Sequence, residues 1–223
     1  MRRVVGILVL ALLAAGCDRG TGPPEPGAPV DPHAVGESVE VGGWSPVDML
    51  LVESGPEVEG AGDPQPDGWV VTVVSPSGPC PGDPMAPEKE VVCVGVEITN
   101  NTAEAGGLDI QTDLPLLADS TGAAAGVTNL RIADTTDWVD FGQAVSVAAD
   151  CTFSAPDDQG VQQADCAAMV VCERRSGVGG EESFGWVAVG AGRTAGYDLE
   201  YIIGVAGSGL ALWWPDGTWF TIP

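Results

Sequence analysis

The pattern that decides the fold is clearest at residues 91–99, which read Val91-Val92-Cys93-Val94-Gly95-Val96-Glu97-Ile98-Thr99. Successive side chains of a β-strand point to opposite faces. The large apolar residues Val92, Val94, Val96 and Ile98 therefore share one face, and the small or polar ones share the other. This alternation is typical of a half-buried strand, and the turn residues Asn100-Asn101-Thr102 follow it directly.

The same reasoning predicts strands along most of the remaining chain. They span residues 69–74, 108–117, 144–153, 168–173, 184–189, 197–203, 210–214 and 219–222. In the stretch 197–203, Tyr197, Leu199, Tyr201 and Ile203 point one way, and Asp198 and Glu200 point the other. The sequence holds 32 Gly and 18 Pro, which supply turns such as 119–122, and no long window has a helical period. Roughly eight or nine strands at this spacing predict an all-β fold, an immunoglobulin-like antiparallel β-sandwich.

The first seventeen residues indicate where the protein is located. Arg2 and Arg3 precede an apolar run of residues 4–15, and Gly16-Cys17 follows. This run is too short to span a bilayer and ends in small residues, as a signal peptide does. Because it ends on a cysteine, it resembles the lipobox of bacterial lipoproteins, in which Cys17 would carry diacylglycerol and an acyl chain such as palmitate. The alternative is a plain secretory signal cleaved nearby.

Composition shifts then divide the mature chain in two. Residues 17–35 are rich in Pro and Gly with few large apolar side chains, a composition typical of an extended tether. The predicted domain covers residues 36–223, and residues 134–180 form an elaborated segment within it. We therefore expect a lipid-anchored domain on the extracytoplasmic face of the cell membrane.

The charge balance excludes one class of partner. The chain has 8 Lys and Arg against 32 Asp and Glu, a formal net charge of -24. Such a surface repels the phosphates of nucleic acids and anionic headgroups. We therefore expect no nucleic-acid partner, and contact with the membrane only through the lipid on Cys17.

The cysteine count predicts disulfides. Beyond Cys17, the chain carries Cys80, Cys93, Cys151, Cys166 and Cys172. Outside the cytoplasm these should be mostly oxidised, and an odd number leaves one unpaired. We predict that Cys80 pairs with Cys93 across a short Pro-rich loop, and that Cys151 pairs with Cys166 or Cys172.

Several of these segments resemble a known family when taken in order. An aromatic-led strand at 69–74 precedes Val94-Gly95-Val96-Glu97-Ile98-Thr99-Asn100, a strand into Asp119-Ser120-Thr121-Gly122 follows, and Gly192-Arg193-Thr194 leads into the strand at 197–203. This order resembles the telokin-like, immunoglobulin-like domains of unknown function in secreted actinobacterial lipoproteins. The resemblance covers most of residues 36–223 and departs from the family pattern at 134–180. It implies a β-sandwich and an envelope location, and implies no activity.

The sequence offers no catalytic constellation. His33 is the single histidine and lies in the predicted tether, so the base that a Ser-His-Asp or Cys-His arrangement requires is lacking. Gly-x-Ser-x-Gly, Walker-type and dinucleotide-binding loops are absent. We therefore expect no cofactor and no enzymatic activity.

Two weaker features suggest a ligand. Asp134, Asp137 and Asp140 cluster oxygen donors of the kind that calcium prefers. Trp213 and Trp214 are adjacent on a predicted strand and so point to opposite faces. We assign Trp214 to the core, as we do Trp69, and Trp213 to the outside, where it either covers an edge or offers a platform to a sugar ring.

These observations support one expectation and an alternative. We expect a non-enzymatic, lipid-anchored protein that presents an immunoglobulin-like domain to an envelope protein or wall component. The alternative is a module that binds cell-wall glycan or calcium.

Overall fold

The computed structural model describes residues 31–52, 55–60, 67–82, 89–141, 145–155, 164–177, 180–204 and 209–223. These residues form sixteen strands in three sheets, and every strand pair is antiparallel. The predicted all-β, antiparallel sandwich is confirmed. The predicted number of strands was too low, chiefly because residues 38–60 and 127–140 also form strands.

The first sheet contains the strand that the sequence marks most clearly. In spatial order it consists of β1 (Ser38–Glu40), β4 (Trp69–Val74), β5 (Lys89–Asn100), β14 (Thr194–Gly204), β9 (Val127–Ile132) and β10 (Val139–Asp140). The predicted faces of β5 and β14 are confirmed: Val94, Val96 and Ile98 are buried, as are Tyr197, Leu199, Tyr201 and Ile203.

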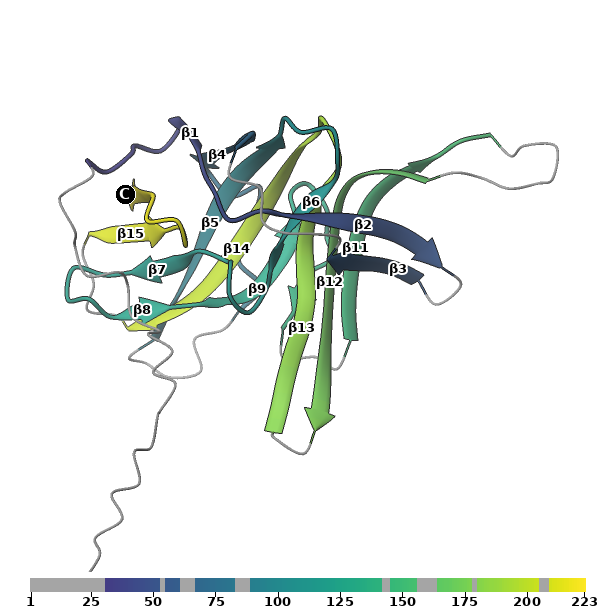
Figure 1. Ribbon diagram of the computed structural model, residues 1–223. Helices are drawn as coiled ribbons and strands as arrows, with labels where there is room; N and C mark the ends of the chain where they lie inside the picture. Colours follow the sequence, from purple (N-terminus) through teal and green to yellow (C-terminus); the bar gives the residue numbers. More distant parts are fainter. Residues whose placement is uncertain are drawn as a thin grey trace, which may run out of the picture.

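The second sheet lies opposite the first (Figure 1). It consists of β11 (Val145–Phe153), β12 (Ala164–Gly177), β13 (Gly180–Val189), β6 (Gly106–Asp109), β2 (Ser45–Val52) and β3 (Gly55–Gly60). The predicted elaborated segment 134–180 thus supplies β10, β11 and all of β12. A third, small sheet of β16 (Trp219–Ile222), β15 (Leu210–Trp213), β7 (Leu116–Ala118) and β8 (Ala124–Ala125) closes one end.

The main core lies between the first two sheets and under the third. The second sheet contributes Ala168, Val170, Cys172, Val187 and Val189 to it, and the third contributes Leu117, Leu212 and Phe220. Trp69 and Trp214 are both 1% exposed, so their predicted places in the core are confirmed. Trp69 stacks on Trp44 with 4.0 Å between ring centroids.

A second apolar cluster gives the molecule an additional layer. β2 pairs with β6 only at Ser45 and Pro46 and then continues as a two-stranded ribbon with β3. This ribbon packs on the outer face of β12 and β13, where Val47 and Val58 meet Met169 and Ala188. Both faces of β12 and β13 are therefore covered where the ribbon crosses them.

The predicted single strand at 108–117 is wrong. The structure has β6 in the second sheet and β7 in the third, with a turn between them. Asp109 causes the break, because its carboxylate accepts a hydrogen bond from the Gln111 amide at 2.8 Å and its carbonyl accepts one from Asp113 at 3.0 Å. Aspartate favours this local turn over an extended ladder.

Candidate functional site

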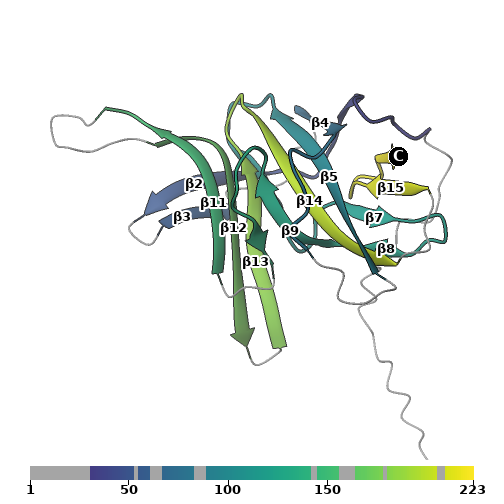
Figure 2. The same cartoon turned by 180° about the vertical axis from the view of Figure 1, so that it is seen from behind.

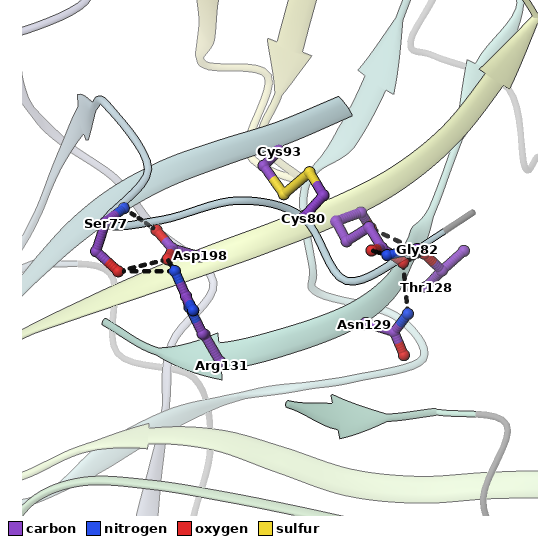
Figure 3. Close-up of a disulfide and its surroundings, with 9 residues drawn as sticks. Ser77, Cys80, Gly82, Cys93, Thr128, Asn129, Arg131 and Asp198 are labelled. Atoms are coloured by element: carbon purple, nitrogen blue, oxygen red, sulfur yellow. Dashed lines mark hydrogen bonds and ion pairs between the residues drawn. A yellow bond between two sulfur atoms is a disulfide. The ribbon is translucent and has the colours of Figure 1, made fainter. Parts of the chain in front are cut away.

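Residues 75–82, here called the strap, follow β4 in the sequence and precede β5. They cross the outer face of the first sheet (Figure 3). A glycine makes the close crossing possible. A Cβ on Gly95 of β5 would lie 2.6 Å from the backbone oxygen of Ser75, so a larger residue would push the strap away. The disulfide between Cys80 and Cys93 joins the strap to β5.

The strap buries Asp198, which alternation had placed on the solvent side of β14. Its side chain is 1% exposed. The Ser77 amide donates to Oδ1 at 2.9 Å, and the Ser77 hydroxyl donates to Oδ2 at 2.6 Å. Arg131 of β9 donates to Oδ2 from Nε at 2.8 Å and from Nη2 at 2.7 Å. The buried charge of Asp198 is thus compensated by a cation and by the strap.

Arg131 is held from a second side. Its guanidinium lies 4.8 Å from the ring centroid of Trp138, within the range of a cation–π interaction. A Cβ on Gly78 would lie 2.7 Å from Nη2, so the strap passes directly over this side chain. Arg131 also contacts the strap directly, because its Nη2 donates to the Ser77 hydroxyl at 3.1 Å.

Glu200 forms the second buried anchor of the strap, two residues along β14. It is 0% exposed. The Gly82 amide donates to Oε2 at 2.8 Å, the Thr128 hydroxyl donates to Oε1 at 3.0 Å, and the Asn129 amide group also donates to Oε1. A Cβ on Gly82 would lie 2.7 Å from Oε2. Asp198 and Glu200 therefore hold the two halves of the strap, with the disulfide between them.

This arrangement is suited to holding the strap rather than to catalysis. A nucleophilic serine needs a base that can take its proton. Ser77 donates to a carboxylate that is already paired with Arg131 and closed off from solvent.

Sequence reasoning assigned Asp198 and Glu200 to the right face and missed that they are buried. The sequence feature that could have revealed this burial is the Pro- and Gly-rich run after β4 that ends in Cys80, because it indicates a segment fixed on the sheet by a disulfide.

The cysteines follow the prediction. Cys80 pairs with Cys93, and Cys151 pairs with Cys166, the first of the two partners proposed for it. Cys172 is the free cysteine among the described residues and is buried in the main core. Burial, with a smaller contribution from the charge of Asp140, raises the pKa of the Cys172 thiol to about 11. The thiol therefore stays protonated and unreactive at neutral pH.

Trp213 lies outside the core, as assigned, and is half-buried. It faces Trp219 across the hairpin of β15 and β16, and the two rings stack with centroids 5.1 Å apart and planes 8° apart. The pair covers the outer side of this hairpin. One ring face of Trp213 is thus already occupied by an aromatic neighbour.

The three aspartates proposed for calcium are not brought together. Asp134 adopts a left-handed turn with φ 63° and donates its amide to Ser77, Asp137 accepts from Thr136, and Asp140 lies on β10 opposite Asn129. In the part of the chain that the structure describes, no three His, Cys, Asp or Glu residues are close enough to hold a metal ion.

His33 belongs to the folded domain, ahead of the predicted boundary at Gly36. Its amide donates to the Trp219 carbonyl at 3.0 Å, and the Thr221 amide donates to its carbonyl at 3.0 Å. Its imidazole contacts Glu37 at 2.9 Å. His33 therefore pairs with β16 instead of extending the tether, and the Gly36 amide, which donates to the Val73 carbonyl at 2.8 Å, lies beside β4.

The predicted signal peptide, Cys17 and residues 17–30 of the tether lie outside the described residues. No helix long and apolar enough to cross a bilayer occurs in the described ranges. Comparison of the chain with protein-family models, with curated proteins and with solved structures finds no match.

Proposed function

We propose that this chain is a non-enzymatic, lipid-anchored protein of the extracytoplasmic face of the cell membrane, whose sandwich is presented to a partner protein. The observation that carries the proposal is the pair of disulfides, Cys80–Cys93 and Cys151–Cys166. Disulfides persist in oxidising compartments outside the cytoplasm, which agrees with export by the predicted signal and lipidation at Cys17.

The arrangement of the strands supports presentation of the end of the sandwich that carries the β2–β3 ribbon and the β11–β12 hairpin to a partner protein. The described chain begins beside β16, near the C-terminus, and the β2–β3 ribbon and the β11–β12 hairpin project on the opposite side (Figures 1 and 2). A domain tethered through residues 17–35 would then hold these hairpins away from the membrane. The family resemblance described above implies the same location.

Replacing the lipidated residue tests the anchor. In cells that express the full chain, we expect Cys17→Ala to shift the protein out of the membrane fraction, because the acyl chains are its proposed attachment. Cys172→Ala is the matched control, since it makes the same exchange of cysteine for alanine but leaves Cys17 in place. Immunoblots of membrane and soluble fractions measure the result. Cys17→Ala protein that stays in the membrane fraction as fully as the control would contradict the anchor.

The half-buried tryptophan pair favours a second candidate, binding of cell-wall glycan. If the outer face of Trp213 stacks on a sugar ring, wall oligosaccharide should raise the melting temperature by binding the folded state. Trp213→Ala should abolish that rise and cost about 1 kcal/mol of stability through the lost stack on Trp219. Trp138→Ala, which removes another half-buried tryptophan, should keep the rise. A melting temperature that oligosaccharide leaves unchanged would remove this candidate.

A further inference from the structure

The edge strands of the three sheets differ in how well they are protected from pairing with another chain, and β11 is the least protected. A bare strand edge is open to pairing with another chain, and natural proteins blunt such edges with short strands, prolines, charges or a cover. β8 and β10 have two residues each and β1 has three. β3 reads Gly-Pro-Glu-Val-Glu-Gly, which contains a proline and two charges. The backbone of His33 covers part of β16.

β11 lacks most of these devices. It is nine residues long, reads Val-Ser-Val-Ala-Ala-Asp-Cys-Thr-Phe, and of the described strands pairs only with β12. It contains no proline and a single charged residue, Asp150. Val147 and Phe153 are 42% and 59% exposed, two of the three large hydrophobic residues exposed among those described. Its protective features are the charge of Asp150 and an irregularity between Asp150 and Cys151.

The backbone beyond this irregularity faces outward at defined positions. The Cα atoms of Cys151 and Cys166 are 4.0 Å apart, which is the close spacing of a non-hydrogen-bonded pair in an antiparallel ladder. The N–H and C=O of Cys151 therefore point away from β12. Phe153, two residues further along, has the same orientation, so it also presents its N–H and C=O to an incoming strand.

The β2–β3 ribbon adds a cover above this edge. β3 contacts β11, β12 and β13, and in both views the ribbon crosses β11 and extends past it (Figures 1 and 2). A strand added to β11 would therefore lie beside the second sheet and under the ribbon. Such a position offers ladder hydrogen bonds along one side and places the ribbon over one face of the added strand.

We propose that the edge of β11 binds an extended, cationic segment of a partner protein as an added strand. This inference rests on the proposed function and names its binding surface. The surroundings of the edge are acidic: Asp150 of β11 is exposed, and the chain as a whole carries a formal net charge of -24. Lysine or arginine in the segment complements this charge. A second copy of the chain, which also carries -24, would be repelled.

A synthetic peptide tests this surface on the full chain purified in detergent. The probe is Lys-Val-Thr-Val-Lys-Val-Thr-Val-Lys with a fluorescent label, matched in length to β11, and binding is measured by anisotropy. We expect binding that weakens as salt rises, and slower amide hydrogen exchange in β11. A peptide with Glu in place of Lys should not bind.

Three variants locate the site. Phe153→Pro removes an outward N–H without touching the ladder to β12 and should weaken binding roughly tenfold. Val147→Lys should weaken it through like-charge repulsion. Val35→Lys, at an exposed valine on the opposite side of the molecule, should leave it unchanged, and thermal melts verify that all three fold.

Absence of binding, equal binding by the Glu peptide, or indifference to the first two variants would overturn the proposal. So would a dimer that Val147→Lys dissociates. None of these outcomes bears on the lipid anchor, which the Cys17→Ala fractionation tests separately.

Discussion

Asp198→Ala is expected to destabilise the domain by about 3–5 kcal/mol, the cost of breaking a buried ion pair by removing one partner. The substitution leaves the guanidinium of Arg131, whose side chain is 9% exposed, without its carboxylate. It also leaves the Ser77 amide and hydroxyl without their acceptor. Urea-induced unfolding of the purified protein measures the change. Asp137→Ala removes an exposed aspartate and should stay within about 0.5 kcal/mol of wild type.

A double variant separates the charge from the strap. If the loss in Asp198→Ala comes from the uncompensated guanidinium, Arg131→Met with Asp198→Leu should regain most of the stability, because apolar residues of similar volume can replace a buried pair at little cost. A double variant as unstable as Asp198→Ala would instead assign the loss to the released strap. A single variant as stable as wild type would contradict the burial of this pair.

Removing the disulfide of the strap is expected to cost about 3 kcal/mol. In the double variant Cys80→Ser with Cys93→Ser, the unfolded chain regains the freedom of a loop closed across a separation of 13 residues. We expect the midpoint of urea unfolding to fall, and amide exchange to rise first at Ser77 and Gly82. Asp198 and Glu200 then hold the strap without covalent help.

The other disulfide supplies the matched control. Cys151→Ser with Cys166→Ser opens a closed loop of similar length, with a separation of 15 residues, so the model of loop closure gives it a similar loss of stability. Its faster exchange should appear in β11 and β12 instead of in the strap. If both double variants loosened the same amides, or if neither loosened the strap, the disulfide would not be what holds residues 75–82 on the sheet.

The strands that could be predicted are those whose two faces differ. β5 alternates valine with small or polar residues, and β14 alternates aromatic or aliphatic residues with carboxylates, so period and face both follow from the sequence. β2 and β3 were missed because Pro46, Pro56 and several acidic residues interrupt their pattern, although Val47 and Val58 are buried between the ribbon and the strands beneath it. β6 and β7 were merged because Asp109 breaks the chain by a local side-chain bond that periodicity does not register.

The candidate site was predictable in part for a similar reason. Cysteine pairing follows from short separations along the chain that bring two thiols together. The pairs Cys80–Cys93 and Cys151–Cys166, with separations of 13 and 15 residues, both agree with this rule. Burial of Asp198 and Glu200 depends on a segment more than a hundred residues away along the chain, with separations of 121 and 118 to Ser77 and Gly82. Alternation within one strand carries no information about such a cover. The aspartates near residue 137 are close in sequence, but their turn and strand geometry separates them.

Lipid attachment at Cys17 underlies the proposed location, and the intact mass of the protein extracted from membranes tests it most directly. We expect a mature chain that begins at Cys17 and carries the added mass of a diacylglyceryl group, with two disulfides formed. A chain that begins at another residue, or at Cys17 without lipid, would contradict it.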